Sequence, residues 1–250
     1  MTINADSSFP LDLSDLRYEA SDKRLINDLS FKLEAGPRTI ILGPNGAGKS
    51  LLLRLCHGLI QPSGGAIRWH GARTRNPSDF QAMVFQRPIM LRRSAQANVD
   101  YALALRGIDR AERKRLTQEV LEKTGLAEFA RRPARVMSFG EQQKLALARA
   151  WVLKPQVLFL DEPTASLDPG ATYAFEEIIA EIHAAGTKII MTTHNMGQAR
   201  RLADEVLFIH QGRLLEQSPA ADFFAAPKNP LAEAFIRGDL LWGPNQEMQS

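Results

Sequence analysis

The chain lacks the sequence features that mark several large classes of protein. Cys56 is its only cysteine, so no disulfide can form within the chain, and its apolar surroundings favour a buried packing residue over a reactive thiol. No apolar run approaches the roughly 20 residues that a membrane-spanning helix needs, and Met1 to Pro10 does not resemble a signal peptide. The sequence therefore predicts a globular chain, with the cytoplasm as its default compartment.

An excess of positive charge is also lacking. The formal net charge is only +3, and the basic residues between Arg110 and Lys123 alternate with Glu112, Glu119 and Glu122, which is typical of a solvated helix face. No aromatic residues that could stack on bases are interleaved with these charges. We therefore expect no nucleic-acid partner.

Glycine, in contrast, is concentrated in a phosphate-binding pattern. Residues Gly43 to Ser50 read GPNGAGKS and match GxxxxGK[ST]. The glycines let backbone N–H groups close around phosphate oxygens, Lys49 adds positive charge, and Ser50 offers a hydroxyl to Mg²⁺. The apolar run from Arg38 to Leu42 predicts a strand before the pattern, and Ser50 to Gly58 predicts a helix after it. The sequence therefore predicts that ATP or GTP binds here, with a glycine turn that holds no ligand as the alternative.

Strand and helix patterns predict an α/β fold that a helical block interrupts. Further strands are expected within 11–35, at 66–69, 82–85, 157–160, 188–193 and 205–209, and a helix over 169–183. Residues 94–153 read as several helices, one of them opened by a capping box formed by Asp109 and Glu112. We expect a core over 1–86 and 155–226 with an antiparallel β region, a helical subdomain over 87–154, and a tail over 227–250. The apolar residues of the tail are expected to pack on the core: Phe235, Ile236, Leu240, Leu241 and Trp242.

Two carboxylates follow a predicted buried strand. Asp161 and Glu162 come directly after Val157 to Leu160, at the strand end where open α/β sheets place their ligands. Asp161 could hold a Mg²⁺ ion that bridges two phosphates, and Glu162 could orient and deprotonate an attacking water. A helix cap or a turn is the plain structural alternative for adjacent acids at this position.

Together with Ser138 to Gln143 (SFGEQQ), Ser166 to Asp168 and His194, these residues make the chain resemble the nucleotide-binding subunit of an ATP-binding cassette (ABC) transporter. The resemblance runs from about residue 11 to residue 226, with the elements in the family's order. It implies a single ABC ATPase domain over 1–250 with a P-loop NTPase core. It also implies two copies of the chain that enclose two ATP molecules and hydrolyse them.

The resemblance assigns a role to each matching residue. Lys49, Gln86, Glu162 and His194 correspond to catalytic positions, and Ser50, Gln86 and Asp161 to Mg²⁺ ligands. Ser138, Gly140, Glu141 and Asp168 correspond to residues at the dimer interface, where the first three meet the partner's ATP. The residues that hold the chain's own ATP would be Gly43, Pro44, Asn45, Gly46, Ala47, Gly48, Lys49, Ser50 and Leu51.

Several positions either differ from the family's usual residue or have a second interpretation. Phe139 stands where the family usually has a glycine, which leaves the local backbone geometry open, and Glu141 stands where it usually has a glutamine. A slower or differently tuned ATPase is the expectation. Tyr18 is the candidate for stacking on the adenine, or is simply a strand residue. Asp168 could also cap the helix that follows it, and Ser138 with Glu141 fits a capping box.

The resemblance also implies membrane partners. The apolar loop Arg87 to Leu91 is the candidate docking surface for a transmembrane permease, which would place the chain at the cytoplasmic face of the inner membrane. Residues 84–93 and 193–202 resemble ATPases of tungstate, molybdate and phosphate importers, systems that include an extracytoplasmic substrate-binding protein. The alternatives are a soluble ABC ATPase not tied to transport and a nucleotide-dependent regulatory module with little hydrolysis.

Overall fold

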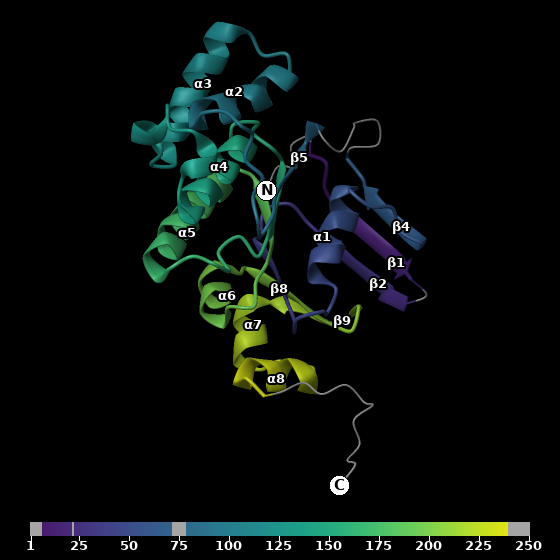
Figure 1. Cartoon of the computed structure of the whole chain (residues 1–250). Helices are drawn as coiled ribbons and strands as arrows, with labels where there is room; N and C mark the ends of the chain where they lie inside the picture. Colours follow the sequence, from purple (N-terminus) through teal and green to yellow (C-terminus); the bar gives the residue numbers. More distant parts are fainter. Residues whose placement is uncertain (1–6, 22, 72–78, 240–250) are drawn as a thin grey trace. The chain divides into compact units, whose positions relative to one another are not determined.

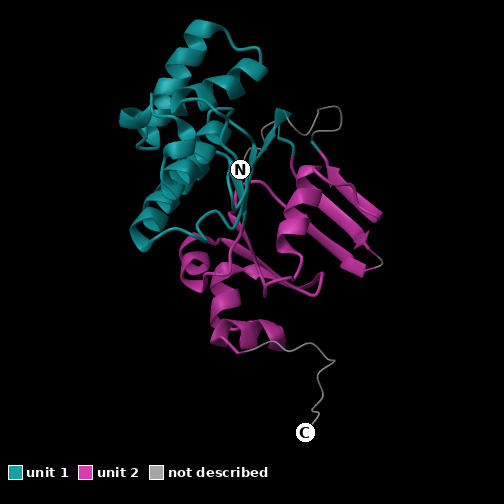
Figure 2. Cartoon of the chain, viewed as in Figure 1, with its two compact units in different colours: residues 1–8, 71–191 teal, residues 9–70, 192–250 magenta. Residues whose placement is uncertain are grey.

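The computed structural model describes residues 7–21, 23–71 and 79–239. The chain divides into two compact units, each assembled from two separate stretches of sequence (Figure 2). Unit 1 comprises residues 1–8 and 71–191, and unit 2 comprises residues 9–70 and 192–250. Each unit is described below by itself.

Unit 2 contains an antiparallel sheet built from strands β1 (Leu11–Ala20), β2 (Lys23–Leu33) and β4 (Gly64–Trp69), in the order β2-β1-β4 (Figure 1). Alternate residues near the start of β1 are buried, including Leu11 and Leu13, as a half-buried strand requires. Leu13 pairs with Phe31 on β2 and with Ile67 on β4. The predicted antiparallel β region is therefore confirmed.

A second group of strands in unit 2 leads to the phosphate-binding pattern. Strand β3 (Thr39–Leu42) is buried throughout and lies parallel to β8 (Glu205–His210), which pairs antiparallel with β9 (Arg213–Pro219). The helices of this unit are α1 (Lys49–His57), α6 (Met196–Leu202), α7 (Ala220–Ala225) and α8 (Pro230–Arg237). The predicted strand and helix on either side of the pattern are thus present, and Gly58 ends α1 in a left-handed conformation.

Helix α8, in the described part of the C-terminal tail, packs on β8, as the sequence predicts for Phe235. The ring of Phe235 on α8 lies 5.4 Å from the ring of Phe208 on β8, and Ile236 is half-buried. The other three residues of this prediction, Leu240, Leu241 and Trp242, lie outside the described residues.

Unit 1 combines three strands with helices. Strand β5 (Gln81–Val84) pairs in parallel with β6 (Val157–Asp161), and β7 (Lys188–Thr192) follows in the order β5-β6-β7. Every residue of β6 and β7 is buried, as expected of parallel strands. The helices are α2 (Ala95–Leu105), α3 (Arg110–Lys123), α4 (Phe139–Trp151) and α5 (Pro169–Ala184), with short 3₁₀ turns η2 (Ala127–Phe129) and η3 (Ala134–Val136).

Local sequence explains where these helices begin. Ser94, Asp109, Ser138 and Asp168 each accept a hydrogen bond from a backbone N–H of the first turn of α2, α3, α4 and α5. The predicted capping box of Asp109 and Glu112 is only half right, because the Glu112 carboxylate binds Arg115 at 2.6 Å instead. That ion pair also lowers the pKa of Glu112.

The architecture confirms the predicted α/β fold class, with an antiparallel β region and a block of helices between strands. The finer division at residues 86, 154 and 226 stays a prediction. In the part of the chain that the structure describes, no helix combines the length and the apolar character needed to cross a bilayer.

Candidate functional site

The phosphate-binding pattern forms a tight loop that only glycine can make. Gly43, Gly46 and Gly48 have φ angles of 151°, 78° and 99°, in the left-handed region that favours glycine. A Cβ atom on Gly43 would lie 2.0 Å from the carbonyl oxygen of Ile209, and one on Gly48 would lie 3.0 Å from Cδ1 of Ile26. The backbone therefore passes close to β2 and β8 at the points where the pattern demands glycine.

Lys49 lies inside this loop. Its side chain is 5% exposed, and Nζ donates to the carbonyl oxygens of Gly43 at 2.8 Å and Pro44 at 3.1 Å. Gly48 opens α1 without a side-chain cap, so the N-terminal amides and the helix dipole suit a phosphate group. A buried ammonium group, a helix N-terminus and a glycine cradle together fit a nucleoside triphosphate.

Gly212, a glycine outside the motif, also supports the loop. The Gly212 N–H donates to the Ala47 carbonyl at 3.0 Å, and the Gly212 carbonyl accepts from the Asn27 N–H at 2.9 Å. Gly212 has a φ of 73°, and a Cβ there would lie 2.3 Å from the Leu25 carbonyl oxygen. Sequence reasoning missed this contribution. The available signal was a glycine three residues after the predicted strand 205–209, which marks a turn but not what the turn touches.

In unit 1, Asp161 and Glu162 stand at the end of β6. Asp161 is 4% exposed, and Glu162 has a φ of 43°, a left-handed conformation that is uncommon for a residue with a side chain. The Glu162 carbonyl accepts a hydrogen bond from the Ala165 N–H at 3.2 Å. The chain thus turns sharply at Glu162, and strained backbone of this kind is common at functional sites.

Strand register brings a third predicted residue to this edge. Val84 on β5 pairs with Leu160 on β6, and the two strands run in parallel. Gln86 and Glu162 therefore follow the same paired position by the same number of residues, at the same edge of the sheet. Within unit 1, the structure brings together Gln86, Asp161 and Glu162.

The residues of the signature segment form the start of α4. The Ser138 N–H donates to the Glu141 carboxylate at 2.7 Å, and the Glu141 N–H donates to Ser138 Oγ at 3.3 Å, which completes the predicted capping box. Phe139 is the first residue of the helix, so its backbone geometry, which the sequence left open, is ordinary right-handed helix. A Cβ on Gly140 would lie 3.6 Å from Leu167 Cδ2, in ordinary contact with the Ser166 to Asp168 segment.

Asp168 caps α5, as its plain structural interpretation predicts. Its carboxylate accepts from the Ala171 N–H at 2.9 Å, and Pro169 occupies the first turn. In unit 2, His194 is exposed on a corner where Thr193 Oγ1 accepts from the Asn195 N–H at 3.1 Å. Thr193 also donates to the buried Gln198 side chain at 2.9 Å. The corner that carries His194 is therefore fixed by its neighbours.

Tyr18 is a half-buried strand residue. It pairs with Ile26 in a part of β1 where the register with β2 shifts repeatedly. Asp15 and Asp28 both have a φ of 47°, and Arg17 forms an ion pair with Asp28. Bulges of this kind add residues between fixed points of paired strands. The role of Tyr18 in stacking on adenine stays a prediction.

The apolar loop after β5 is held through its backbone. Arg149 donates to the Ile89 carbonyl at 3.1 Å, and Arg135 donates to the Met90 carbonyl at 3.2 Å. The Ile89 side chain is 76% exposed, whereas Met90 is buried and Leu91 is half-buried. Of the apolar residues expected to face a partner, Ile89 is therefore the one most available.

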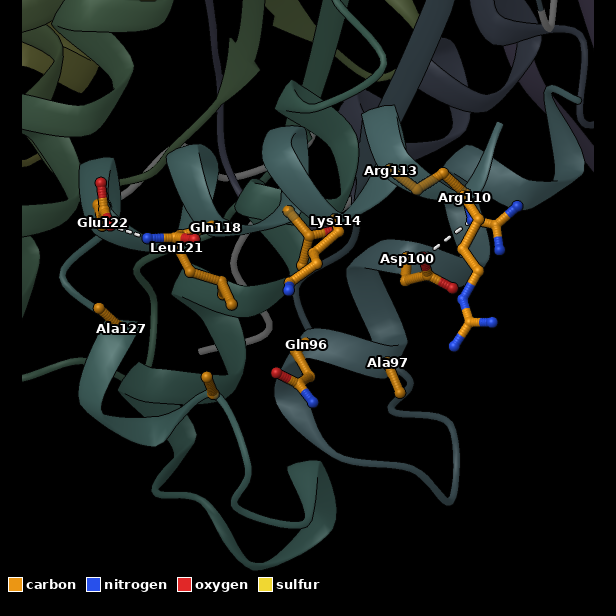
Figure 3. Close-up of a pocket in the computed structure, with 12 residues that line it drawn as sticks. Gln96, Ala97, Asp100, Arg110, Arg113, Lys114, Gln118, Leu121, Glu122 and Ala127 are labelled. Carbon is orange, nitrogen blue, oxygen red and sulfur yellow. Dashed lines mark hydrogen bonds and ion pairs between the residues drawn. The ribbon is translucent and has the colours of Figure 1, made fainter. Parts of the chain in front are cut away.

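A separate pocket of about 600 Å³ lies among the helices of unit 1 (Figure 3). Asp100 on α2 and Arg113 on α3 form an ion pair of 2.9 Å on its wall, and the amide of Gln118 donates to the Glu122 carboxylate at 3.0 Å. None of the predicted site residues lines this pocket. We therefore assign it no part in the site.

Cys56 is buried on α1, as the sequence predicts. Burial raises the pKa of its thiol from the ordinary value of 9.0 to about 12. The thiol is therefore protonated at neutral pH, which agrees with a packing role. Burial likewise lowers the pKa of the neighbouring His57.

Comparison with known proteins supports one family. A model described as ABC transporter matches residues 26–165. The tungstate uptake ATP-binding protein TupC of Peptoclostridium acidaminophilum is 37% identical over 82% of this chain and 96% of its own. A phosphate import ATP-binding protein of Vibrio parahaemolyticus is 34% identical over 93% of this chain and 92% of its own. A solved structure of cbiO1 from Clostridium perfringens, part of the ABC transporter complex cbiONQ, has a TM-score of 0.78 at 27% identity, over 91% of this chain and 94% of that chain.

Proposed function

The chain belongs to the ABC transporter family and is an ATP-binding ATPase of that family, and on this premise we propose that it powers the import of an oxyanion. The names of two relatives support this class of cargo, tungstate for one and phosphate for the other. Within this class a tungstate-like oxyanion, tungstate or molybdate, is the preferred cargo, and the tungstate relative has the higher identity of the two, 37% against 34%. The cargo itself does not touch this subunit.

We propose that ATP binds with Mg²⁺. The glycine cradle and Lys49 would hold the phosphates, and Leu51 follows them on α1. Ser50, Asp161 and Gln86 supply the hydroxyl, carboxylate and amide oxygens that Mg²⁺ prefers as ligands. When bound, the ion supplies charge that stabilises the transferring phosphoryl group.

Glu162 is the proposed general base. Its carboxylate would orient the attacking water and accept its proton, while His194 and Lys49 stabilise charge on the γ-phosphate. The sharp backbone turn at Glu162 and its shared sheet edge with Gln86 support these roles. Phosphoryl transfer depends chiefly on such positioning and on charge stabilisation.

The active form is proposed to be a dimer of this chain. The capped start of α4 presents Ser138, Gly140 and Glu141 at a helix N-terminus, which suits a phosphate held by a second copy. Asp168 would cross the same interface. Sites completed from both copies couple hydrolysis to closing and opening of the dimer.

The remaining partners are a transmembrane permease and an extracytoplasmic substrate-binding protein. The exposed Ile89 side chain supports the docking of a permease on the loop after β5. Through the permease, the chain would lie at the cytoplasmic face of the inner membrane. A soluble ABC ATPase and a regulatory module with little hydrolysis are the competing functions.

One observation carries the proposal, namely Lys49 buried inside a loop that tolerates only glycine at Gly43. The purified chain should release phosphate from MgATP, and Lys49→Ala should reduce the rate by about 100-fold or more, while Lys32→Ala should not. Co-expression with the permease should restore uptake of radiolabelled tungstate or molybdate to a strain that lacks this ATPase. Uptake of neither oxyanion would exclude the proposed cargo, and absent hydrolysis would favour the regulatory alternative.

A further inference from the structure

The side chain of Gln143 reaches from α4 to the end of β5. It is 0% exposed, and its Nε2 donates to the Gln86 carbonyl oxygen at 2.7 Å and to the Phe85 carbonyl oxygen at 3.4 Å. Both acceptors are main-chain atoms of the segment that carries the proposed Mg²⁺ ligand. The contact lies wholly within unit 1.

The other end of the same amide has no partner. Gln143 Oε1 is buried and accepts no hydrogen bond from any described residue. An unsatisfied buried acceptor destabilises a fold, and methionine or leucine would fill a similar space without it. Because two carbonyl oxygens accept from Nε2, these bonds fix which end of the Gln143 amide carries the nitrogen. When a residue that lowers stability is nevertheless present, a functional role for that residue is indicated.

The backbone between β5 and α2 is tied to α4 at a second point. Arg149, which lies on α4 as Gln143 does, donates to the Ile89 carbonyl at 3.1 Å. From the other side, the buried Asn98 on α2 accepts from the Leu91 N–H at 3.0 Å and donates to the Ser94 carbonyl at 3.0 Å. The exposed Ile89 therefore stands between fixed points, and Gln143 fixes the point nearest to Gln86.

We propose that Gln143 is a positioning residue for ATP hydrolysis, which acts by holding the Gln86 peptide so that the Gln86 side chain points to Mg²⁺. This inference rests on the proposed function, in which Gln86 contacts the metal and water. Gln143 itself touches neither nucleotide nor metal. Because Ser138 caps α4, the Gln143 side chain links the first turns of the signature helix to Gln86.

Two variants test the role of the donors. Gln143→Met keeps the length of the side chain and removes the N–H groups, and Gln143→Glu replaces them with a carboxylate that faces two carbonyl oxygens. Gln118→Met is the matched control, since Gln118 is exposed on α3 and its amide donates to the Glu122 carboxylate of the same helix at 3.0 Å. Thermal unfolding of each variant shows whether the fold is intact.

The readouts are kcat and the Mg²⁺ concentration that gives half-maximal hydrolysis. For Gln143→Met we expect an unfolding temperature close to that of wild type, because removal of the unpaired Oε1 offsets the loss of the two donated bonds. We also expect a several-fold higher Mg²⁺ requirement and a kcat about 10-fold lower, because small misplacements near reacting groups have large effects on rate. Gln143→Glu should lose more activity than Gln143→Met. Gln118→Met should match wild type.

A double mutant separates positioning from a general structural role. If Gln143 acts through Gln86, Gln143→Met should change kcat less than about twofold when it is added to Gln86→Ala. An equal loss in both backgrounds, or wild-type kinetics for Gln143→Met, would overturn the inference while leaving the ATPase assignment intact. Absence of hydrolysis by the wild-type chain would instead overturn the proposed function, and the inference with it.

Discussion

Ser138 and Glu141 exchange two hydrogen bonds at the start of α4, each side chain accepting from the backbone N–H of the other residue. The pair fixes the first turn of the helix that carries the signature segment. It also places a carboxylate where the family usually has a neutral amide, with Arg132 at 3.5 Å as its nearest cation. The proposed binding site for the partner's γ-phosphate therefore contains a negative charge.

Replacing Glu141 with glutamine should raise the rate of ATP hydrolysis. Glutamine can also accept from the Ser138 N–H, so the capping box survives and the free energy of unfolding should change by less than about 1 kcal/mol. Loss of the charge removes repulsion of the phosphate, and a rise in kcat of several-fold is the expected result in a phosphate-release assay. Glu141→Ala keeps Ser138 as the N-cap but loses the bond from the Ser138 N–H, so it serves as the control for stability. A slower Glu141→Gln enzyme would show that the carboxylate assists the reaction.

Helix starts were the most predictable parts of this fold because they depend on neighbours in sequence. Ser138 with Glu141 and Asp168 with Pro169 could be predicted, since the atoms that meet lie within a few residues of each other. The capping box at Asp109 was wrong in part because Arg115, equally close along α3, competes for the Glu112 carboxylate. Local chemistry favours both partners, and only the folded geometry selects one.

Contacts between residues far apart in the chain could not be predicted from the sequence. Gly212 holds Ala47, and Gln143 holds Gln86, but the partners in each pair are far apart along the chain. Neither contact has a spacing that could reveal it, because strand order and helix packing create both. The sequence also left the backbone geometry at Phe139 open. A missing glycine signals strain only where φ is positive, and Phe139 lies in a right-handed helix.

Glu162→Gln should trap the chain as a dimer with ATP bound. The neutral amide cannot accept a proton from water, so hydrolysis should fall by about 100-fold or more while nucleotide binding persists. Light scattering after gel filtration with MgATP should show the dimer, and no dimer should form without nucleotide. Glu177→Gln, at an exposed position on α5, is the matched control and should behave as wild type. Rapid turnover by Glu162→Gln would assign the base to another residue.

Ile89→Asp should release the chain from its permease. The Ile89 side chain is 76% exposed on a loop whose backbone Arg149 and Arg135 hold, so the substitution changes the surface without disturbing the fold. We expect loss of co-purification with the permease and unchanged binding of ATP. Leu105→Asp, at a side chain that is 70% exposed, is the control for a charge on an apolar surface residue. Equal recovery of the permease with both variants would move the docking surface elsewhere.

Cys56 should make the stability of the chain fall at alkaline pH. Its folded pKa of about 12 exceeds the ordinary 9.0, so its contribution is fully present below pH 9 and is lost as pH rises toward 12. Between these values the unfolded chain releases a proton that the folded chain keeps, a slope of up to about 1.4 kcal/mol per pH unit. Cys56→Ala removes the titrating group, so denaturant unfolding should give the variant a shallower decline with pH. Parallel pH profiles, or rapid labelling of the native thiol at pH 8, would show that Cys56 is accessible to solvent.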